Sequence, residues 1–119
     1  MKKLTKKEEE VMKILWKLNK AFVKDIIAEY PDPQPHYNTV SSLVRLLQEK
    51  GLIGFTAYGN TYEYFPLLTK EDYRGSFMSQ VVKDYFDNSY KNAVAFFVKE
   101  KGLKPEELEE LIELIKKEE

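Results

Sequence analysis

Residues 37–53, with the sequence YNTVSSLVRLLQEKGLI, carry the clearest helical pattern in the chain. Apolar side chains recur there every three or four residues, as they do along one stripe of an α-helix. These side chains are Val40, Leu43, Val44 and Leu47. Gly51 follows at the point where a helix commonly ends in a left-handed residue. The pattern predicts a helix over residues 38–50 with one buried face.

The opposite face of this predicted helix is small and polar, and it carries Asn38, Ser41, Ser42 and Arg45. An ordinary solvated helix face is rich in Lys and Glu, because Asn and Ser are poor formers of helix interiors. A helix in the major groove of DNA needs short side chains, so that its backbone can approach the base edges, and a few groups that hydrogen-bond to them. This face therefore predicts DNA recognition.

The composition is that of an ordinary globular protein. The chain has 119 residues, of which 33% are charged and 43% apolar, and it contains no Cys. No apolar run approaches the ~18 residues that a membrane span requires. Lys2 and Lys3 precede acidic residues rather than the apolar core of a secretion signal. We expect a cytoplasmic protein with no stable membrane association, no disulfide and no cysteine metal site.

The net charge of −1 is unevenly distributed along the chain. Residues 1–66 contain ten Lys or Arg and eight Asp or Glu, whereas residues 67–119 contain nine and twelve. The part that holds the candidate recognition helix is thus mildly basic, which is compatible with a nucleic-acid partner.

Two further helices are predicted before residue 37. Thr5 is a candidate N-cap with Glu8 as its capping-box partner, and an apolar stripe continues to Leu18. Helical spacing returns at Val23 and ends before the proline-rich connector 31–35. The only histidine, His36, is expected to be exposed or near a DNA phosphate, because a lone histidine without Cys is a poor metal or catalytic candidate.

After Gly51 the pattern alternates, as in a β-hairpin. Residues 52–57 and 61–66 are rich in β-forming side chains, and Gly59-Asn60 suits the turn between them. Three helices followed by a hairpin are the order of a winged helix, whose hairpin tip lies on the sugar-phosphate backbone. The tip residues Tyr58, Asn60 and Thr61 are therefore candidate DNA contacts. The alternative is that the hairpin only covers the helical core.

Residues 69–119 are predicted to form three amphipathic helices. Their aromatic and aliphatic side chains exceed what so small a unit can bury alone, so a second copy of the chain is expected to cover them. The alternative is that the helices fold back on residues 1–68. The candidate dimerisation residues are Tyr73, Phe77, Val81, Tyr85, Val94, Phe97, Leu108, Leu111, Ile112 and Ile115.

The predicted fold class is mainly α with a small antiparallel β-hairpin. Residues 1–68 form a winged-helix DNA-binding domain and residues 69–119 a helical dimerisation domain. No Cys nucleophile, Gly-rich phosphate loop or zinc-binding HExxH motif is present, so we expect neither an enzyme nor a cofactor or metal site.

Several motifs of the chain resemble the penicillinase-repressor family of the BlaI/MecI/CopY type. They are LT at 4–5, EEEVM at 8–12, ILW at 14–16, YNTV at 37–40, KGLI at 50–53, YEY at 62–64 and FFV at 96–98. The resemblance implies a bacterial repressor that binds a palindromic operator as a dimer. It also implies a set of DNA-reading residues, Asn38, Thr39, Ser41 and Ser42, with Arg45 and the wing tip on the backbone.

The resemblance further implies how such a repressor is released. Members that govern β-lactam resistance are cut after a membrane sensor-protease is triggered, at an Asn-Phe bond that aligns with Phe96-Phe97. Three features depart from the family pattern. Phe96 stands where the cut members have Asn, so cleavage at this bond is a hypothesis. Asn38 and Ser41 stand where basic residues are common, which predicts weaker phosphate attraction, and the absence of Cys excludes the copper sensing of the copper-responsive branch.

Two other functions remain open at the level of the sequence. Winged helices also bind proteins, so the chain could be an interaction module without specific DNA binding. A repressor controlled by a small ligand among the C-terminal aromatic residues is the other alternative.

Overall fold

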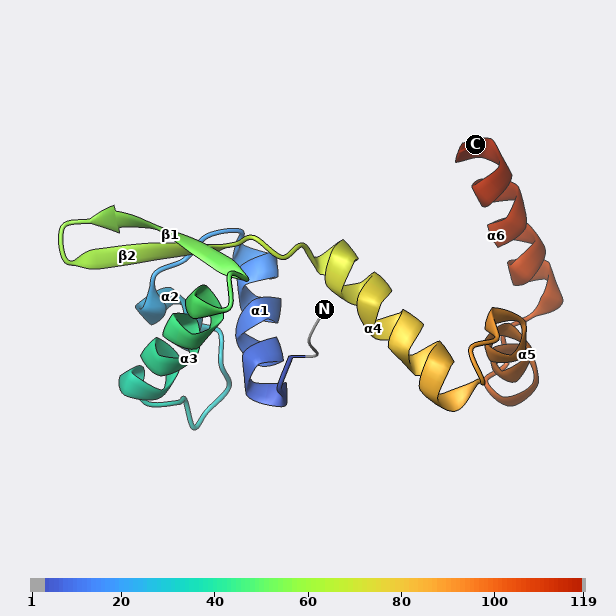
Figure 1. Ribbon diagram of the computed structural model, residues 1–119, viewed down its shortest axis with the longest axis horizontal. Coiled ribbons are helices and arrows are strands. Elements are labelled where there is room, and N and C mark those ends of the chain that lie inside the picture. The colour runs from blue at the N-terminus through green and yellow to red at the C-terminus, as the bar shows by residue number, and fades with distance from the viewer. Residues whose placement is uncertain (1–3, 119) are drawn as a thin grey trace. The chain divides into compact units, whose positions relative to one another are not determined.

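The computed structural model describes residues 4–118, apart from the side chains at positions 115, 117 and 118 (Figure 1). Its elements are mainly helical with one antiparallel hairpin, which confirms the predicted fold class. In chain order they are α1 (Lys6–Leu18), α2 (Val23–Ala28), α3 (Tyr37–Glu49), β1 (Ile53–Tyr58), β2 (Thr61–Pro66), α4 (Lys70–Tyr85), α5 (Tyr90–Glu100) and α6 (Pro105–Glu118). The chain divides into two compact units between Ser76 and Phe77.

The first helix begins at the predicted capping box. The Thr5 hydroxyl accepts a hydrogen bond from the Glu8 amide at 3.2 Å, and the Glu8 carboxylate accepts one from the Thr5 amide at 2.9 Å. These two bonds satisfy backbone donors that a helix start otherwise leaves unpaired. The predicted start of α1 is thus confirmed.

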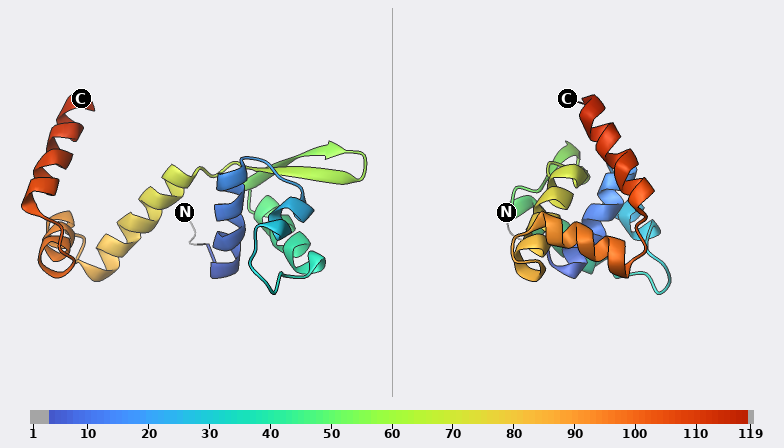
Figure 2. Two further views of the ribbon diagram at one scale, coloured as in Figure 1. Left: turned by 180° about the vertical axis from the view of Figure 1, so that it is seen from behind. Right: turned by 90° about the vertical axis from the view of Figure 1, so that its right-hand side faces the viewer.

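Helices α1, α2 and α3 pack around one apolar core, and the hairpin lies against them with its turn projecting beyond the helices (Figures 1 and 2). This is the winged-helix arrangement. Its fully buried side chains include Val11 and Leu15 of α1 and Val40, Val44 and Leu47 of α3. Leu43, which was also predicted to face inward, is partly buried.

The hairpin is joined to the helices through Tyr64 of β2. Ala21 and Tyr64 exchange two backbone hydrogen bonds, at 2.9 and 2.8 Å, in an antiparallel bridge. Ala21 thus forms a strand-like bridge to the hairpin, and the chain enters α2 two residues later, at Val23. The Tyr64 side chain is buried in the core, and this contact fixes the wing beside α3.

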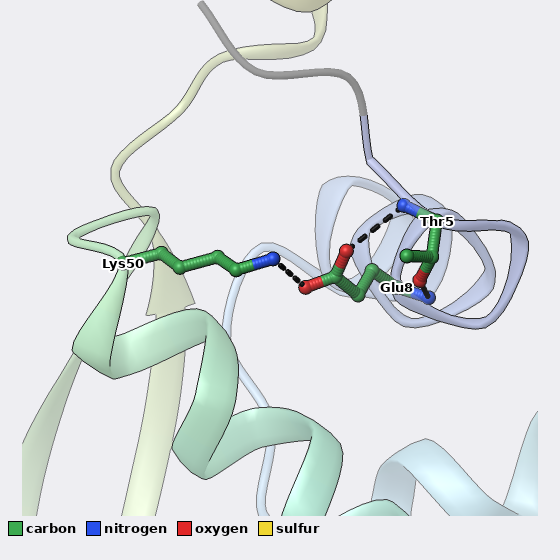
Figure 3. Close-up of polar contacts among 3 residues, drawn as sticks. All are labelled: Thr5, Glu8 and Lys50. Atoms are coloured by element: carbon green, nitrogen blue, oxygen red, sulfur yellow. Dashed lines mark hydrogen bonds and ion pairs between the residues drawn. The ribbon is translucent and has the colours of Figure 1, made fainter.

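A buried ion pair links the start of α1 to the end of α3. Glu8 is fully buried, and its second carboxylate oxygen lies 2.6 Å from the Lys50 ammonium group (Figure 3). Burial by itself raises the pKa of Glu8, but hydrogen bonds from Lys50 and Thr5 outweigh it, so the pKa falls below its ordinary value. Glu8 is therefore ionised at neutral pH and holds two helices together.

The first turns of α4 belong to the winged-helix unit. Tyr73 is buried, its ring centroid lies 5.8 Å from that of Trp16, and its hydroxyl donates to Glu9 at 2.9 Å. Burial, followed by the hydrogen bond to Glu9, raises the pKa of Tyr73 to about 12. Trp16 in turn donates to the Leu68 carbonyl at 2.8 Å. These contacts explain why the division between the units falls within α4, beyond residue 68.

The second unit has few buried side chains. Among its described side chains, only Val82 and Ala93 are buried. Phe96 contacts Phe86 and Phe97, with ring centroids 5.5 and 5.7 Å apart. Most of the remaining apolar side chains of this unit are exposed.

Glu8→Gln should lower the free energy of unfolding by about 1–3 kcal/mol at neutral pH, because Gln can keep the capping box but loses the ion pair with Lys50. The depressed pKa means that ionised Glu8 stabilises the fold above its ordinary pKa of 4.5, and that this contribution disappears as the pH falls below that value. Urea unfolding at neutral pH and at about pH 3 measures both effects.

Glu10→Gln, at an exposed position of the same helix, is the matched control and should change little. If Glu8→Gln destabilised the protein equally at both pH values, the ion pair could not be the cause.

Candidate nucleic-acid interface

Helix α3 presents its polar face to solvent. Asn38, Thr39, Ser42 and Arg45 are exposed, whereas Ser41 is half-buried. On the opposite stripe of the same helix, Val40, Val44 and Leu47 are fully buried and Leu43 is partly buried. Each sequence-predicted reading residue thus lies on the side of α3 that faces away from the core.

His36 fixes the start of α3. Its imidazole Nδ1 accepts a hydrogen bond from the Asn38 amide at 3.0 Å, so His36 is the N-cap of the helix. The accepting Nδ1 requires the tautomer with the proton on Nε2, which leaves that N–H on an exposed side chain. The sequence predicted the exposure of His36 but missed the cap, because Ser, Thr, Asn and Asp are the usual N-cap residues.

The wing tip is a two-residue turn. Gly59 has a φ of +64°, a conformation in which a residue with a side chain would be strained. Tyr58, Asn60 and Thr61 are all exposed around this turn. Tyr58 also contacts Phe22, with ring centroids 6.0 Å apart, so the tip is supported from the segment that precedes α2.

A hollow of about 450 Å³ lies between α3 and the wing, and we refer to it as the α3–wing hollow. It brings together four of the predicted DNA contacts, Ser41, Arg45, Asn60 and Thr61. Asn38, Thr39, Ser42 and Tyr58 are not among its lining residues. The other side chains that line it are Phe22, Val23, Lys24, Tyr37, Gln48, Tyr62 and Tyr64.

Side chains of α3 influence the pKa of Tyr64 on the wing. Burial raises the pKa of Tyr64, the neighbouring Tyr37 raises it further, and Arg45 opposes the rise. Arg45 of α3 and Tyr64 of β2 both line the hollow, so the Arg45 charge lies on the side of α3 that faces the wing. Sequence reasoning missed Lys24, Tyr37 and Tyr62, because only the folded chain brings them to this hollow.

The predicted dimerisation residues differ in their exposure. Tyr73 is packed inside the winged-helix unit, so its burial removes it from any surface available to a second copy. Val81 and Leu108 are half-buried, and Ile115 lies outside the residues whose side chains are described. The exposed group consists of Phe77, Tyr85, Val94, Phe97, Leu111 and Ile112.

The Phe96–Phe97 bond lies inside α5, and both side chains are partly exposed. Within the described residues, no cluster of His, Cys, Asp or Glu could hold a metal ion. None of the helices in residues 4–118 combines the length and the apolar character needed to cross a lipid bilayer.

A winged helix with an exposed polar third helix is an architecture found among DNA-binding domains. The family model described as penicillinase repressor matches residues 4–117, and the chain therefore belongs to the penicillinase repressor family. This confirms the resemblance found in the sequence. The family is one of DNA-binding transcriptional repressors associated with antibiotic resistance, and it is not an enzyme family. No individual curated protein matches the sequence.

His36→Ala should destabilise the protein by about 0.5–2 kcal/mol, because the Asn38 amide loses its acceptor. His36→Asn restores a favoured N-cap residue and should recover most of this loss. Urea unfolding measures the stability, and hydrogen exchange at the Asn38 amide reports the cap itself. Unchanged protection of that amide in His36→Ala would show that the imidazole does not cap α3 in solution.

Proposed function

We propose that the protein is a homodimeric repressor that binds a near-palindromic DNA operator. Each copy inserts α3 into the major groove and lays the wing tip, residues 58–61, on the sugar-phosphate backbone. The two half-sites then lie about 10 base pairs, or a small multiple of this, apart. Family membership supports the repressor function, and the geometry of each unit supports the finer assignments.

The single observation that carries the DNA assignment is the exposed polar face of α3. Asn38, Thr39 and Ser42 are short and can hydrogen-bond to base edges, while Ser41 lies deeper beside Arg45 in the α3–wing hollow. None of these side chains is used by the core, although they cost helix propensity. A surface of this kind is expected where a helix must approach base pairs closely.

The dimer proposal is supported by the exposed apolar side chains of the second unit. Phe77, Leu111 and Ile112 are 36%, 47% and 44% exposed, and only two described side chains of the unit are buried. So small an interior cannot stabilise three helices. Apolar surface from a second copy would cover them through a two-fold, isologous interface.

For release from the operator, we propose that the Phe96–Phe97 bond is cleaved after a membrane sensor-protease is triggered. A protease needs an extended substrate, whereas this bond is helical and Phe96 packs against Phe86. Cleavage would therefore require local unfolding of α5. Removal of the following residues would separate α6 from the rest of the unit.

A gel-shift experiment with the DNA just upstream of the protein's own coding region tests the proposed function. Specific retardation that survives an excess of unrelated duplex is expected. The rival function is a winged-helix module that binds proteins without specific DNA binding. No retardation even at low salt, where electrostatic binding is strongest, would favour that rival.

Leu111→Asp should weaken self-association by a factor of about 100 or more, because an unpaired carboxylate would be buried at the proposed interface. Sedimentation equilibrium measures the dissociation constant. Glu110→Ala, at an exposed acidic position of the same helix, is the matched control and should leave dimerisation intact. Equal dissociation constants for both variants would remove this face of α6 from the interface.

A further inference from the structure

The wing of this protein carries no cation. Residues 53–66, which form β1, β2 and their turn, contain neither Lys nor Arg, and their only charged residue is Glu63. Contacts to the DNA backbone draw much of their affinity from Lys and Arg, because neutralising a phosphate releases counterions. The positive charge for this contact must therefore come from another element.

The α3–wing hollow supplies such charge. Lys24 of α2 and Arg45 of α3 both line it, and none of its lining residues is acidic. Among the described side chains, neither cation takes part in an ion pair. Glu63 lies between Tyr62 and Tyr64 along β2, and the alternation of a strand directs it to the other face of the hairpin. The hollow thus concentrates positive charge in a chain of net charge −1.

Hydrogen-bond donors line the same hollow as these two cations. Tyr37 and Tyr62 contribute phenolic hydroxyls, and Asn60 and Thr61 contribute the polar groups of the turn. Ammonium, guanidinium, hydroxyl and amide groups are the donors that bind phosphate oxygens in protein–DNA complexes. The predicted reading residues of α3 at positions 38, 39 and 42 lie outside the hollow, whereas Ser41 lines it together with Arg45.

We propose that the α3–wing hollow binds one phosphate group of the DNA backbone, held between Lys24 and Arg45 with the Tyr62 hydroxyl as a further donor. The proposal rests on the proposed function and adds Lys24 of α2 to the DNA-contacting residues. Lys24 is a positioning residue in this scheme. It sets where α3 lies along the backbone and reads no base.

Lys24→Ala tests the proposal in the full-length protein, with the operator found by gel shift as the ligand. Operator affinity should fall by about three- to tenfold at low salt, and the slope of log affinity against log salt should become shallower by about 0.9. A fourfold rise in salt concentration should consequently reduce the ratio of wild-type to variant affinity by about 3.5-fold. Affinity for unrelated duplex should fall by the same factor, because a phosphate contact carries no sequence information.

Lys20→Ala is the matched control. Lys20 is exposed, lies outside the hollow and changes the net charge by the same amount when replaced. Its affinity should stay within about twofold of the wild type, with an unchanged salt slope. Thermal unfolding of both variants confirms that each is folded, and exposed Lys→Ala changes in ordinary surface positions alter stability little.

A double-mutant cycle tests whether the two cations share one phosphate. The fold-loss of operator affinity in the double variant should then be smaller than the product of the fold-losses in Lys24→Ala and Arg45→Ala. Both single variants remove a contact to the same phosphate. Multiplicative losses would assign the two cations to different phosphates and overturn the shared site.

The remaining outcomes separate the inference from the function on which it rests. If the wild type binds its operator and Lys24→Ala matches Lys20→Ala, the inference fails while the repressor function stands. If Lys24→Ala weakens operator binding but not binding to unrelated duplex, Lys24 reads a base and the phosphate assignment fails. A wild type that binds no DNA at low salt overturns both.

Discussion

The arrangement of the DNA-binding unit depends on one buried carboxylate. Glu8 has lost its water, and a charge in that position is tolerated only when its oxygens are fully hydrogen-bonded. One oxygen accepts from the Thr5 amide at the start of α1 and the other binds Lys50 just after α3. The same carboxylate therefore caps α1 and binds the residue that follows α3. This contact helps to fix the orientation of α3 relative to α1.

With α3 held at its end by Lys50 and at its start by His36, its two faces can serve different purposes. The inner stripe fills the core, and the outer face is free to carry small polar residues that do not stabilise the fold. Arg45 is the one cation among the predicted DNA contacts on this face, so α3 by itself gains little electrostatic attraction to DNA. This explains why Lys24 and Arg45, on separate helices beside the wing, are needed to anchor the backbone in the proposed complex.

Short-range patterns predicted much of this structure, and long-range contacts account for what they missed. The capping box of Thr5 and Glu8, the stripe of α3 and the Gly59-Asn60 turn involve neighbours in sequence, so spacing alone revealed them. The Glu8–Lys50 pair joins residues 42 positions apart, and no periodicity marks it. Lys24 likewise reaches the α3–wing hollow only when α2 packs beside the wing in the folded chain. Tyr73 was predicted at a dimer surface because an apolar stripe shows that a face is covered without showing by what.

The burial of Tyr73 also bears on how the two units work together. Helix α4 begins within the DNA-binding unit, held there by Trp16 and Glu9, and continues into the unit that is proposed to dimerise. A dimer binds its second half-site as an intramolecular event, which can raise affinity by about 10²–10⁴ without any new contact to DNA. A cut within α5 would leave α1, α3 and the wing intact, yet it would remove this gain by weakening the dimer. In the proposed mechanism, loss of avidity would thus release the operator without any change in the polar face of α3.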